Sequence, residues 1–248
     1  MSIKLKFSVI GFLFLFFIAA TFSLSNHYTF ADQKYIELAG NYVKTNSELL
    51  SKSINTVEDK IANNEDVVTN VNLLPITIQE IEFRKGLRQV AGDVDVSDKA
   101  VFNTLIEEKL IISYAIKYNI LPSKREIDDF IASERVSYDK EATTKKLIDD
   151  FCAAANMSIE DYWKTYEYYN AYRIVTFKRA YDYAIEAGIN KGELKALKNN
   201  NPMDTQTVSE HEGYWKKIKK ELKDKTSLEI NKQYQNRGFN IDKSKLYL

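Results

Sequence analysis

Apolar residues follow two patterns along this chain, one continuous and one periodic. From Phe7 to Leu24 the chain is almost entirely apolar, and no charged residue lies between Lys6 and Asp32. Beyond that run, apolar residues recur mostly at intervals of three and four, which is the spacing of one face of an α-helix. The pattern therefore predicts an apolar leader followed by a series of amphipathic helices.

The apolar leader, residues 1–31, has the order of a secretory signal, with Lys4 and Lys6 ahead of the apolar run. A helix of 18 residues is ~27 Å long, which is just enough to span a bilayer. A cleaved signal peptide and a retained signal anchor both fit, and a buried core helix is the third interpretation. In the first two cases the rest of the chain is exported, because the lysines stay inside.

Residues 32–66 carry a narrow apolar seam on a helix that is otherwise rich in Lys, Glu, Asn and Ser. The seam is interrupted at Asn46, which weakens a coiled-coil interpretation. Two interpretations stay open: a helix that packs on the main domain, or a stalk or dimerising helix that would make the protein a homodimer. The residues of the seam are Tyr35, Ala39, Tyr42, Leu50, Ile54, Val57 and Ile61.

A strand, a tight turn and a helix start are predicted around Pro75. Valines dominate Val67–Val71, and Pro75 cannot donate to a sheet, so it is expected to end the strand. Thr77 and Glu80 have capping-box spacing, in which the hydroxyl and the carboxylate each accept a backbone N–H at a helix start. The helix is therefore expected from Ile78 to about Val90.

Four more helices are predicted in the main domain, residues 67–187, from apolar periodicity and polar caps. The first has the wide apolar arc of a central helix. Ser123 with Glu126 opens the second, and Ser158 with Asp161 opens the long last helix. The four helices are expected at about Ser97–Tyr118, from Ser123 onward, at Glu141–Ala155 and at Ser158–Ala187.

The end of the chain predicts a loop at residues 188–208 and, at residues 209–248, a closing helix, a short strand and a tail. Ser209 is expected to cap that helix. Ser227–Asn231 alternates like a strand and is expected to pair with Val67–Val71, which would join the two ends of the domain. The predicted fold class is mainly α, with a small two-stranded β element.

Composition supports a globular, helical protein. The chain is 44% hydrophobic and 28% charged, and it has few glycines (8) and prolines (3). Lys plus Arg equals Asp plus Glu, at 35 each, whereas nucleic-acid-binding proteins usually carry a basic excess, so no nucleic-acid partner is expected. Cys152 is the only cysteine, which excludes an intramolecular disulfide.

No motif for catalysis, metal binding or cofactor binding occurs: the sequence has no Gly-rich phosphate loop, no His-Glu-x-x-His and no Cys-x-x-Cys. Adjacent acidic pairs such as Glu107 and Glu108 do not face one another on a helix and are interpreted as solvated. Cys152 lies on an apolar helix face with no histidine nearby in sequence, so a small buried hydrophobe is expected rather than a nucleophile. We therefore expect neither an enzyme nor a cofactor.

Aromatic residues are concentrated on the long helix, between Tyr162 and Tyr183. One face must pack on other helices, and core packing is the usual role of such a stripe. Aromatics lie on more than one face, however, and tyrosine combines a large contact area with a hydroxyl, which suits loose binding of extended chains. The candidate peptide-binding residues are Tyr162, Trp163, Tyr166, Tyr169, Tyr172 and Phe177.

The order of these motifs resembles the N-terminal chaperone domain of the SurA and PrsA type of extracytoplasmic foldases, which is similar to the peptide-binding part of trigger factor. The resemblance covers residues 67–187, and Trp215–Asn231 is similar to the helix and strand that complete the domain in the family. The motifs that carry it are Pro75-Ile76-Thr77 with Glu80, the helix around Leu105–Ile111, the segment Tyr118–Ile127 and the helix opening Asn156–Trp163.

Members of this family typically carry one or more parvulin prolyl-isomerase domains between the long helix and the closing helix, where this chain has only residues 188–208. Its two histidines, His27 and His211, give no histidine pair for isomerase chemistry. Asn72-Leu73 replaces the usual Asn-Gly, which makes a positive-φ turn less favourable. The resemblance therefore implies the chaperone half of a foldase without its catalytic half.

These observations lead us to expect an extracytoplasmic protein, secreted or anchored on the outer face of the cell membrane, that binds unfolded or secreted polypeptides without isomerase catalysis. If the leader is uncleaved, its apolar helix also contacts the membrane. The alternative is a membrane-tethered structural or interaction protein that binds one specific partner through the Tyr35–Ile61 helix. The two functions differ in the breadth of their binding.

Overall fold

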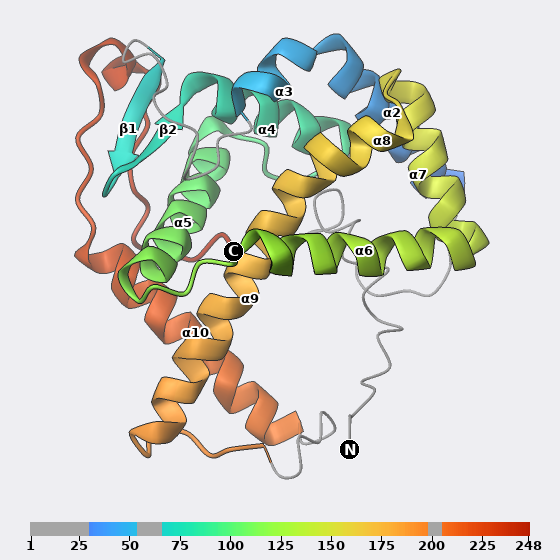
Figure 1. Ribbon diagram of the computed structural model, residues 1–248. Helices are drawn as coiled ribbons and strands as arrows, with labels where there is room; N and C mark the ends of the chain where they lie inside the picture. Colours follow the sequence, from blue (N-terminus) through green and yellow to red (C-terminus); the bar gives the residue numbers. More distant parts are fainter. Residues whose placement is uncertain (1–29, 54–65, 198–204) are drawn as a thin grey trace. The chain divides into compact units, whose positions relative to one another are not determined.

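The computed structural model describes residues 30–53, 66–197 and 205–248 (Figure 1). In these ranges the chain is mainly helical with one small two-stranded sheet, which confirms the predicted mainly α class. No helix in the same ranges is long and apolar enough to cross a membrane. The predicted leader up to residue 29 lies outside them.

The described residues form two compact units whose segments alternate along the chain. Unit 1 contains residues 30–53, 79–97 and 124–171. Unit 2 contains residues 66–78, 98–123, 172–197 and 205–248.

Unit 1 is helical throughout its described residues. In it α2 packs along α7, and α6 packs against α7 (Figure 1). A three-residue helix and one turn of π-helix lead directly into α9. The elements are α2 (Phe30–Thr45), α3 (Ser47–Ser53), α4 (Ile78–Val90), α6 (Lys124–Lys140), α7 (Ala142–Ala155), α8 (Ile159–Asp161), η2 (Tyr162–Tyr166) and the start of α9 (Glu167–Asn190).

Helix α2 is packed closely within unit 1. Ile36, Ala39 and Val43 are almost fully buried. Gly40 lies so close to α7 that a Cβ added there would be 2.6 Å from the Cβ of Ala154. These contacts match the interpretation of a helix that packs on the domain rather than that of a free stalk.

The predicted seam on this helix is only partly the buried face. Ala39 and Leu50 are buried, and Tyr35 and Tyr42 are half-buried, whereas the buried Ile36 and Val43 were not part of the seam. The rest of the seam, Ile54, Val57 and Ile61, lies outside the described residues.

Unit 2 is built around α5 (Asp98–Lys117), with a β-hairpin and α10 (Thr205–Lys225) packed against it (Figure 1). The hairpin joins β1 (Val67–Val71) to β2 (Leu74–Thr77) in antiparallel register, with Val71 opposite Leu74 and Asn70 opposite Pro75. A short 3-10 helix, η4 (Lys232–Arg237), follows α10.

The hairpin corrects the prediction that Pro75 ends the strand. Pro75 lies inside β2, a second strand that the sequence pattern did not predict. Proline is tolerated there because β2 has a single neighbour in the sheet, so a missing N–H does not interrupt a second ladder. Asn72 supplies the positive φ of the turn, 56°, and Leu73 is 94% exposed, so an Asn-Leu turn closes without glycine.

The predicted pairing of Ser227–Asn231 as a second strand is wrong in detail, because the two strands are β1 and β2 and residues 227–231 are not a strand. The segment nevertheless lies along β1. The N–H of Asn231 donates to the carbonyl of Val68 at 2.9 Å, and the Thr69 hydroxyl donates to the carbonyl of Glu229 at 2.8 Å. The end of the chain therefore does return to the first strand.

Most predicted helix starts are confirmed. Helix α4 begins directly after Thr77, α5 directly after Ser97 and α6 directly after Ser123. The Ser158 hydroxyl accepts the N–H of Asp161 at 3.0 Å, as a capping residue does. These starts are encoded locally by polar residues ahead of apolar periodicity.

The helix ends around the predicted loop differ from the prediction. Helix α9 runs on to Asn190, and α10 already begins at Thr205, so Ser209 lies within α10 and does not cap it. The connection is thus residues 191–204 rather than 188–208. Ile116, expected on the apolar side of α5, is 42% exposed.

Candidate functional site

The predicted peptide-binding residues do not form one surface. Tyr162, Trp163 and Tyr166 are buried in unit 1. Tyr162 and Tyr166 pack on Phe151 of α7, at ring-centroid distances of 6.0 Å and 5.0 Å, and Trp163 packs edge-on against Tyr138 at 5.8 Å. These three side chains build the core of unit 1 and offer almost no surface to a partner.

The other three predicted residues are divided between the units. Tyr169 is half-buried in unit 1, where Arg84 donates to its hydroxyl at 3.4 Å. In unit 2, Tyr172 is buried, and Phe177 is half-buried with the Arg173 guanidinium 5.6 Å from its ring centroid. Of the six residues, only Tyr169 and Phe177 keep an appreciable exposed area, and their role in binding stays a prediction.

A different group of aromatic side chains lies together on unit 2, and we call it the aromatic face. At its centre the Tyr114 ring contacts those of Tyr118 at 4.7 Å, Tyr183 at 6.1 Å and Trp215 at 6.1 Å. Three helices contribute to it, α5, α9 and α10. The aromatic face consists of Tyr114, Tyr118, Phe177, Tyr181, Tyr183, Trp215, Ile218 and Leu222.

The aromatic face packs on buried alanines of α9 but remains partly exposed. Ala180 and Ala184 of α9 are fully buried under it, and such small side chains allow the aromatic rings of α5 and α10 to approach closely. Tyr118 is 39% exposed, and Tyr183 and Trp215 are half-buried. Ring-to-ring contacts restrict the rotamers, so the surface is rigid and amphipathic, which is suited to contact with apolar segments.

The central phenol of the aromatic face stays protonated at physiological pH. Burial, and then the neighbouring phenols of Tyr118 and Tyr183, raise the pKa of Tyr114 to about 12. The centre of the face is therefore uncharged.

Part of this face was visible in the sequence. The spacing of Trp215, Ile218 and Leu222 places them on one side of a helix, and all three pack against the same buried cluster. Tyr114 and Tyr118 were missed, although their spacing of four residues places them on one side of a helix. The contact between these helices is long-range, so no local signal could have shown it.

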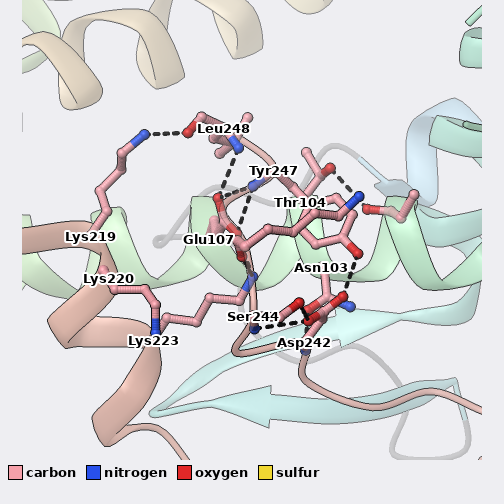
Figure 2. A network of polar contacts seen from close by, with 12 residues as sticks. Asn103, Thr104, Glu107, Lys219, Lys220, Lys223, Asp242, Ser244, Tyr247 and Leu248 are labelled. Carbon is pink, nitrogen blue, oxygen red and sulfur yellow. Dashed lines mark hydrogen bonds and ion pairs between the residues drawn. The ribbon is translucent and has the colours of Figure 1, made fainter. Parts of the chain in front are cut away.

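Unit 2 also contains a polar network that fixes residues 226–248, which we call the return segment. Figure 2 shows Glu107 of α5 at its centre. The carboxylate accepts the backbone N–H of Tyr247 at 2.9 Å and that of Leu248 at 2.8 Å, and it pairs with Lys223 of α10 at 2.5 Å. Lys223 also donates to the carbonyl of Lys245 at 3.0 Å.

One helical turn earlier, the side chain of Asn103 forms hydrogen bonds with the same segment. Its side-chain amide donates to the carbonyl of Asn240 at 3.0 Å, and its amide oxygen accepts the N–H of Asp242 at 2.7 Å. We call Asn103, Glu107 and Lys223 the seat; their exposed fractions are 0%, 2% and 0%. Glu107 is therefore buried and paired, which corrects the interpretation of this carboxylate as solvated.

Asp242 organises the return segment itself rather than the seat. It accepts the Ser244 N–H at 2.9 Å and the Tyr247 hydroxyl at 2.8 Å, and it pairs with Lys99 at 3.0 Å (Figure 2). Hydrogen bonds from Ser244, and then those from Lys99 and Tyr247, hold the pKa of its carboxyl below the usual range. Asp242 thus stabilises the turn that presents Tyr247 and Leu248 to Glu107, and Lys245 to Lys223.

Unit 1 contains a buried pair of carboxyl groups, Glu134 of α6 and Glu167 of α9. Glu134 is 8% exposed and Glu167 is fully buried. The two carboxyls share a hydrogen bond, and Glu167 also accepts the Tyr162 hydroxyl at 2.9 Å and a hydrogen bond from Asn170. The π-helical turn places these groups together, because the Glu167 N–H donates to the Tyr162 carbonyl five residues back.

The protonation of this pair differs from that of ordinary glutamates. Burial, followed by the Glu167 charge, raises the pKa of Glu134 to about 10. Burial raises the pKa of Glu167 to about 7, although hydrogen bonds from Glu134, Tyr162 and Asn170 oppose that rise. At neutral pH the pair therefore keeps at least one proton, which the two carboxyls share.

The remaining chemical candidates have structural partners. Cys152 is buried, as predicted, and burial followed by the Asp149 charge raises its pKa to about 12, which makes it a poor nucleophile. Glu108 is buried and pairs with Arg173, which is another correction of the solvated pair. Across the described ranges, no group of three or more His, Cys, Asp and Glu side chains could hold a metal ion.

Comparison of the chain with models of protein families, with curated proteins and with solved structures found no match.

Proposed function

We propose that this chain is an exported, chaperone-like protein that holds unfolded or secreted polypeptides and does not catalyse prolyl isomerisation. The observation that carries the proposal is the aromatic face of unit 2. Partly exposed rings, fixed by their contacts around Tyr114, form a surface that accommodates apolar segments of varied sequence. Such contacts need neither a cofactor nor a metal.

The order of elements supports a SurA- or PrsA-like chaperone domain. A β-hairpin leads into a series of helices, and those that begin after Thr77, Ser123 and Ser158 follow the order of the motifs that carry the resemblance. The return segment contacts β1, as the closing segment of that family would. The connection 191–204 is too short for an isomerase domain, which agrees with a chaperone function alone.

Export is part of the proposal and rests on the apolar run Phe7–Leu24 behind two lysines. The protein would act outside the cytoplasm, either released after cleavage or attached to the outer face of the membrane. Mass spectrometry of the mature N-terminus, together with membrane fractionation, decides between the two forms. Recovery of the full chain in the soluble cytoplasmic fraction would contradict export.

The function is tested by the suppression of aggregation of several unrelated unfolded proteins. We expect Tyr118→Ala with Trp215→Ala to raise the protein concentration needed for half-suppression about tenfold, because a few aromatic contacts dominate such binding. Tyr168→Ala is the matched control: this half-buried tyrosine lies in unit 1, with Lys124 6.0 Å from its ring centroid, and should change nothing.

The alternative function predicts a different outcome. A tethered protein that binds one partner through the Tyr35–Ile61 helix would not suppress aggregation and would retain a single stoichiometric partner in a pull-down. The burial of Ile36, Ala39 and Val43 within unit 1 leaves less of that helix available. An active isomerase would show turnover of a prolyl peptide that one substitution abolishes, and that result would overturn the proposal.

A further inference from the structure

The last part of the return segment, residues 238–248, is bound to unit 2 mainly through its backbone. It contains neither helix nor strand. The carbonyls of Asn240 and Lys245 and the N–H groups of Asp242 and Tyr247 all bond to seat side chains. Main-chain groups of this kind occur in every polypeptide, so these bonds carry little sequence information.

Side chains of the segment add polar contacts, from Asp242 to Lys99 and from Lys243 to the carbonyl of Asp224, but little apolar contact. Phe239 is the large apolar side chain of residues 238–248 that is buried, against Phe102 at a ring-centroid distance of 4.9 Å. Ile241, Leu246 and Tyr247 are only half-buried, and Leu248 is 41% exposed. The segment is therefore attached by polar contacts to a polar surface rather than by insertion into the core.

A polar seat can open at a lower cost than an apolar core. When the segment leaves, water can hydrate Asn103, and Glu107 can keep its ion pair with Lys223. In the closed form the same pair is desolvated, which offsets part of what its hydrogen bonds contribute. Closed and open forms therefore differ less in free energy than the number of hydrogen bonds suggests.

From this arrangement we propose that the seat is a second polypeptide-binding site, which accepts a backbone with the turn of residues 242–244 and which the return segment keeps occupied. An incoming chain with such a turn replaces the segment by forming the same backbone bonds to Asn103, Glu107 and Lys223. The biological role of this site rests on the proposed polypeptide-holding function, whereas the geometry of the seat is independent of that function.

The test is the binding of a fluorescent synthetic peptide with the sequence of residues 238–248 to the full chain. Asp242→Ala loosens the turn of the segment and leaves the seat intact, so we expect the peptide to bind this variant about tenfold more tightly than the unsubstituted chain. Adding Asn103→Ala should abolish that gain. A peptide that keeps Asp242 to Ser244 in place but is scrambled elsewhere should bind comparably.

Asp182→Ala is the matched control, since Asp182 is exposed on α9 in the same unit and pairs with Lys178 at the surface. It should bind the peptide as the unsubstituted chain does. If Asp242→Ala does not fold, amide exchange on the unsubstituted chain serves instead, and excess peptide should accelerate exchange at Tyr247 and Leu248.

Three results would overturn the inference: equal binding by Asp242→Ala and the unsubstituted chain, binding that survives Asn103→Ala, or failure of the scrambled peptide. The first two place the peptide elsewhere, and the third makes the segment a specific structural closure. Trp215→Ala should leave peptide exchange unchanged. If the chain exchanges the peptide but suppresses no aggregation, that result would therefore contradict the proposed function and still support this inference.

Discussion

Two carboxylic acids meet inside unit 1, and they make its stability depend on pH. Glu134 and Glu167 are buried against one another, with Tyr162 and Asn170 as their neutral partners. Both pKa values are higher in the folded chain than in an unfolded one, so folding favours the protonated forms. The stability that protonation contributes is fully present below about pH 4.5, and it is lost as pH rises through about 7 and then about 10.

Glu134→Gln removes one of the two acids but keeps a hydrogen-bond donor towards Glu167. We expect this variant to exceed the unsubstituted chain in free energy of unfolding at pH 8 by roughly 1 to 3 kcal/mol, and to lose less stability between pH 5 and pH 8. Urea unfolding at the two pH values measures both quantities. The matched control is Glu186→Gln, an exposed glutamate on α9, which should leave the pH dependence unchanged. An equal loss of stability at both pH values in Glu134→Gln would contradict the shared proton.

Individual side chains show where sequence-based prediction stops. Cys152 was predicted correctly, because an apolar helix face with no histidine nearby is a local feature. Glu107 and Glu108 were interpreted as solvated, yet they are buried with Lys223 and Arg173 as partners. Those partners are far away in sequence, so their charges could not be assigned to these carboxylates from spacing alone.

At the scale of elements, α2 packs closely on α7. Gly40→Ala would place a methyl group 2.6 Å from the Cβ of Ala154 and 2.7 Å from the carbonyl oxygen of Phe151. We expect this substitution to lower the free energy of unfolding by about 1–3 kcal/mol, because the two helices must move apart. Thermal or urea unfolding of the full chain measures the change.

Gly213→Ala is the control for that substitution. Gly213 also lies in a helix, α10, but no atom is within 4 Å of an added Cβ. Alanine should therefore stabilise the chain by about 0.5–1 kcal/mol, through its better helix propensity. If Gly40→Ala behaves in the same way, α2 does not pack on α7, and the stalk interpretation of residues 32–66 becomes the better one.

Helix starts could be predicted and sheet pairing could not, for a physical reason. A capping residue such as Ser158 accepts a hydrogen bond from an N–H three residues away, so a helix start is encoded by residues that are close in sequence. The pairing of β1 depended on whether Pro75 ends a strand or lies within an edge strand, and both are compatible with proline chemistry. The π-helical turn at Tyr162–Tyr166 has no simple sequence signal and was also missed.

At the scale of the whole molecule, both proposed binding sites depend on contacts between segments that are distant in sequence. The aromatic face combines residues from α5, α9 and α10, and the return segment joins β1 and the seat. The aromatic stretch of the long helix was recognised in the sequence, but most of the six residues chosen there are core. The half-buried Tyr181 and Tyr183 lie nearer the end of that helix, where rings from α5 and α10 pack against it.

Binding of unfolded polypeptides by the aromatic face is tested most directly by photo-crosslinking of a benzophenone-labelled unfolded peptide to the full chain, with the labelled positions identified by mass spectrometry. We expect crosslinks at Tyr118, at Phe177–Tyr183 and at Trp215–Leu222, and their loss in the Tyr118→Ala and Trp215→Ala double variant. Crosslinks confined to α2, with none on unit 2, would contradict such binding.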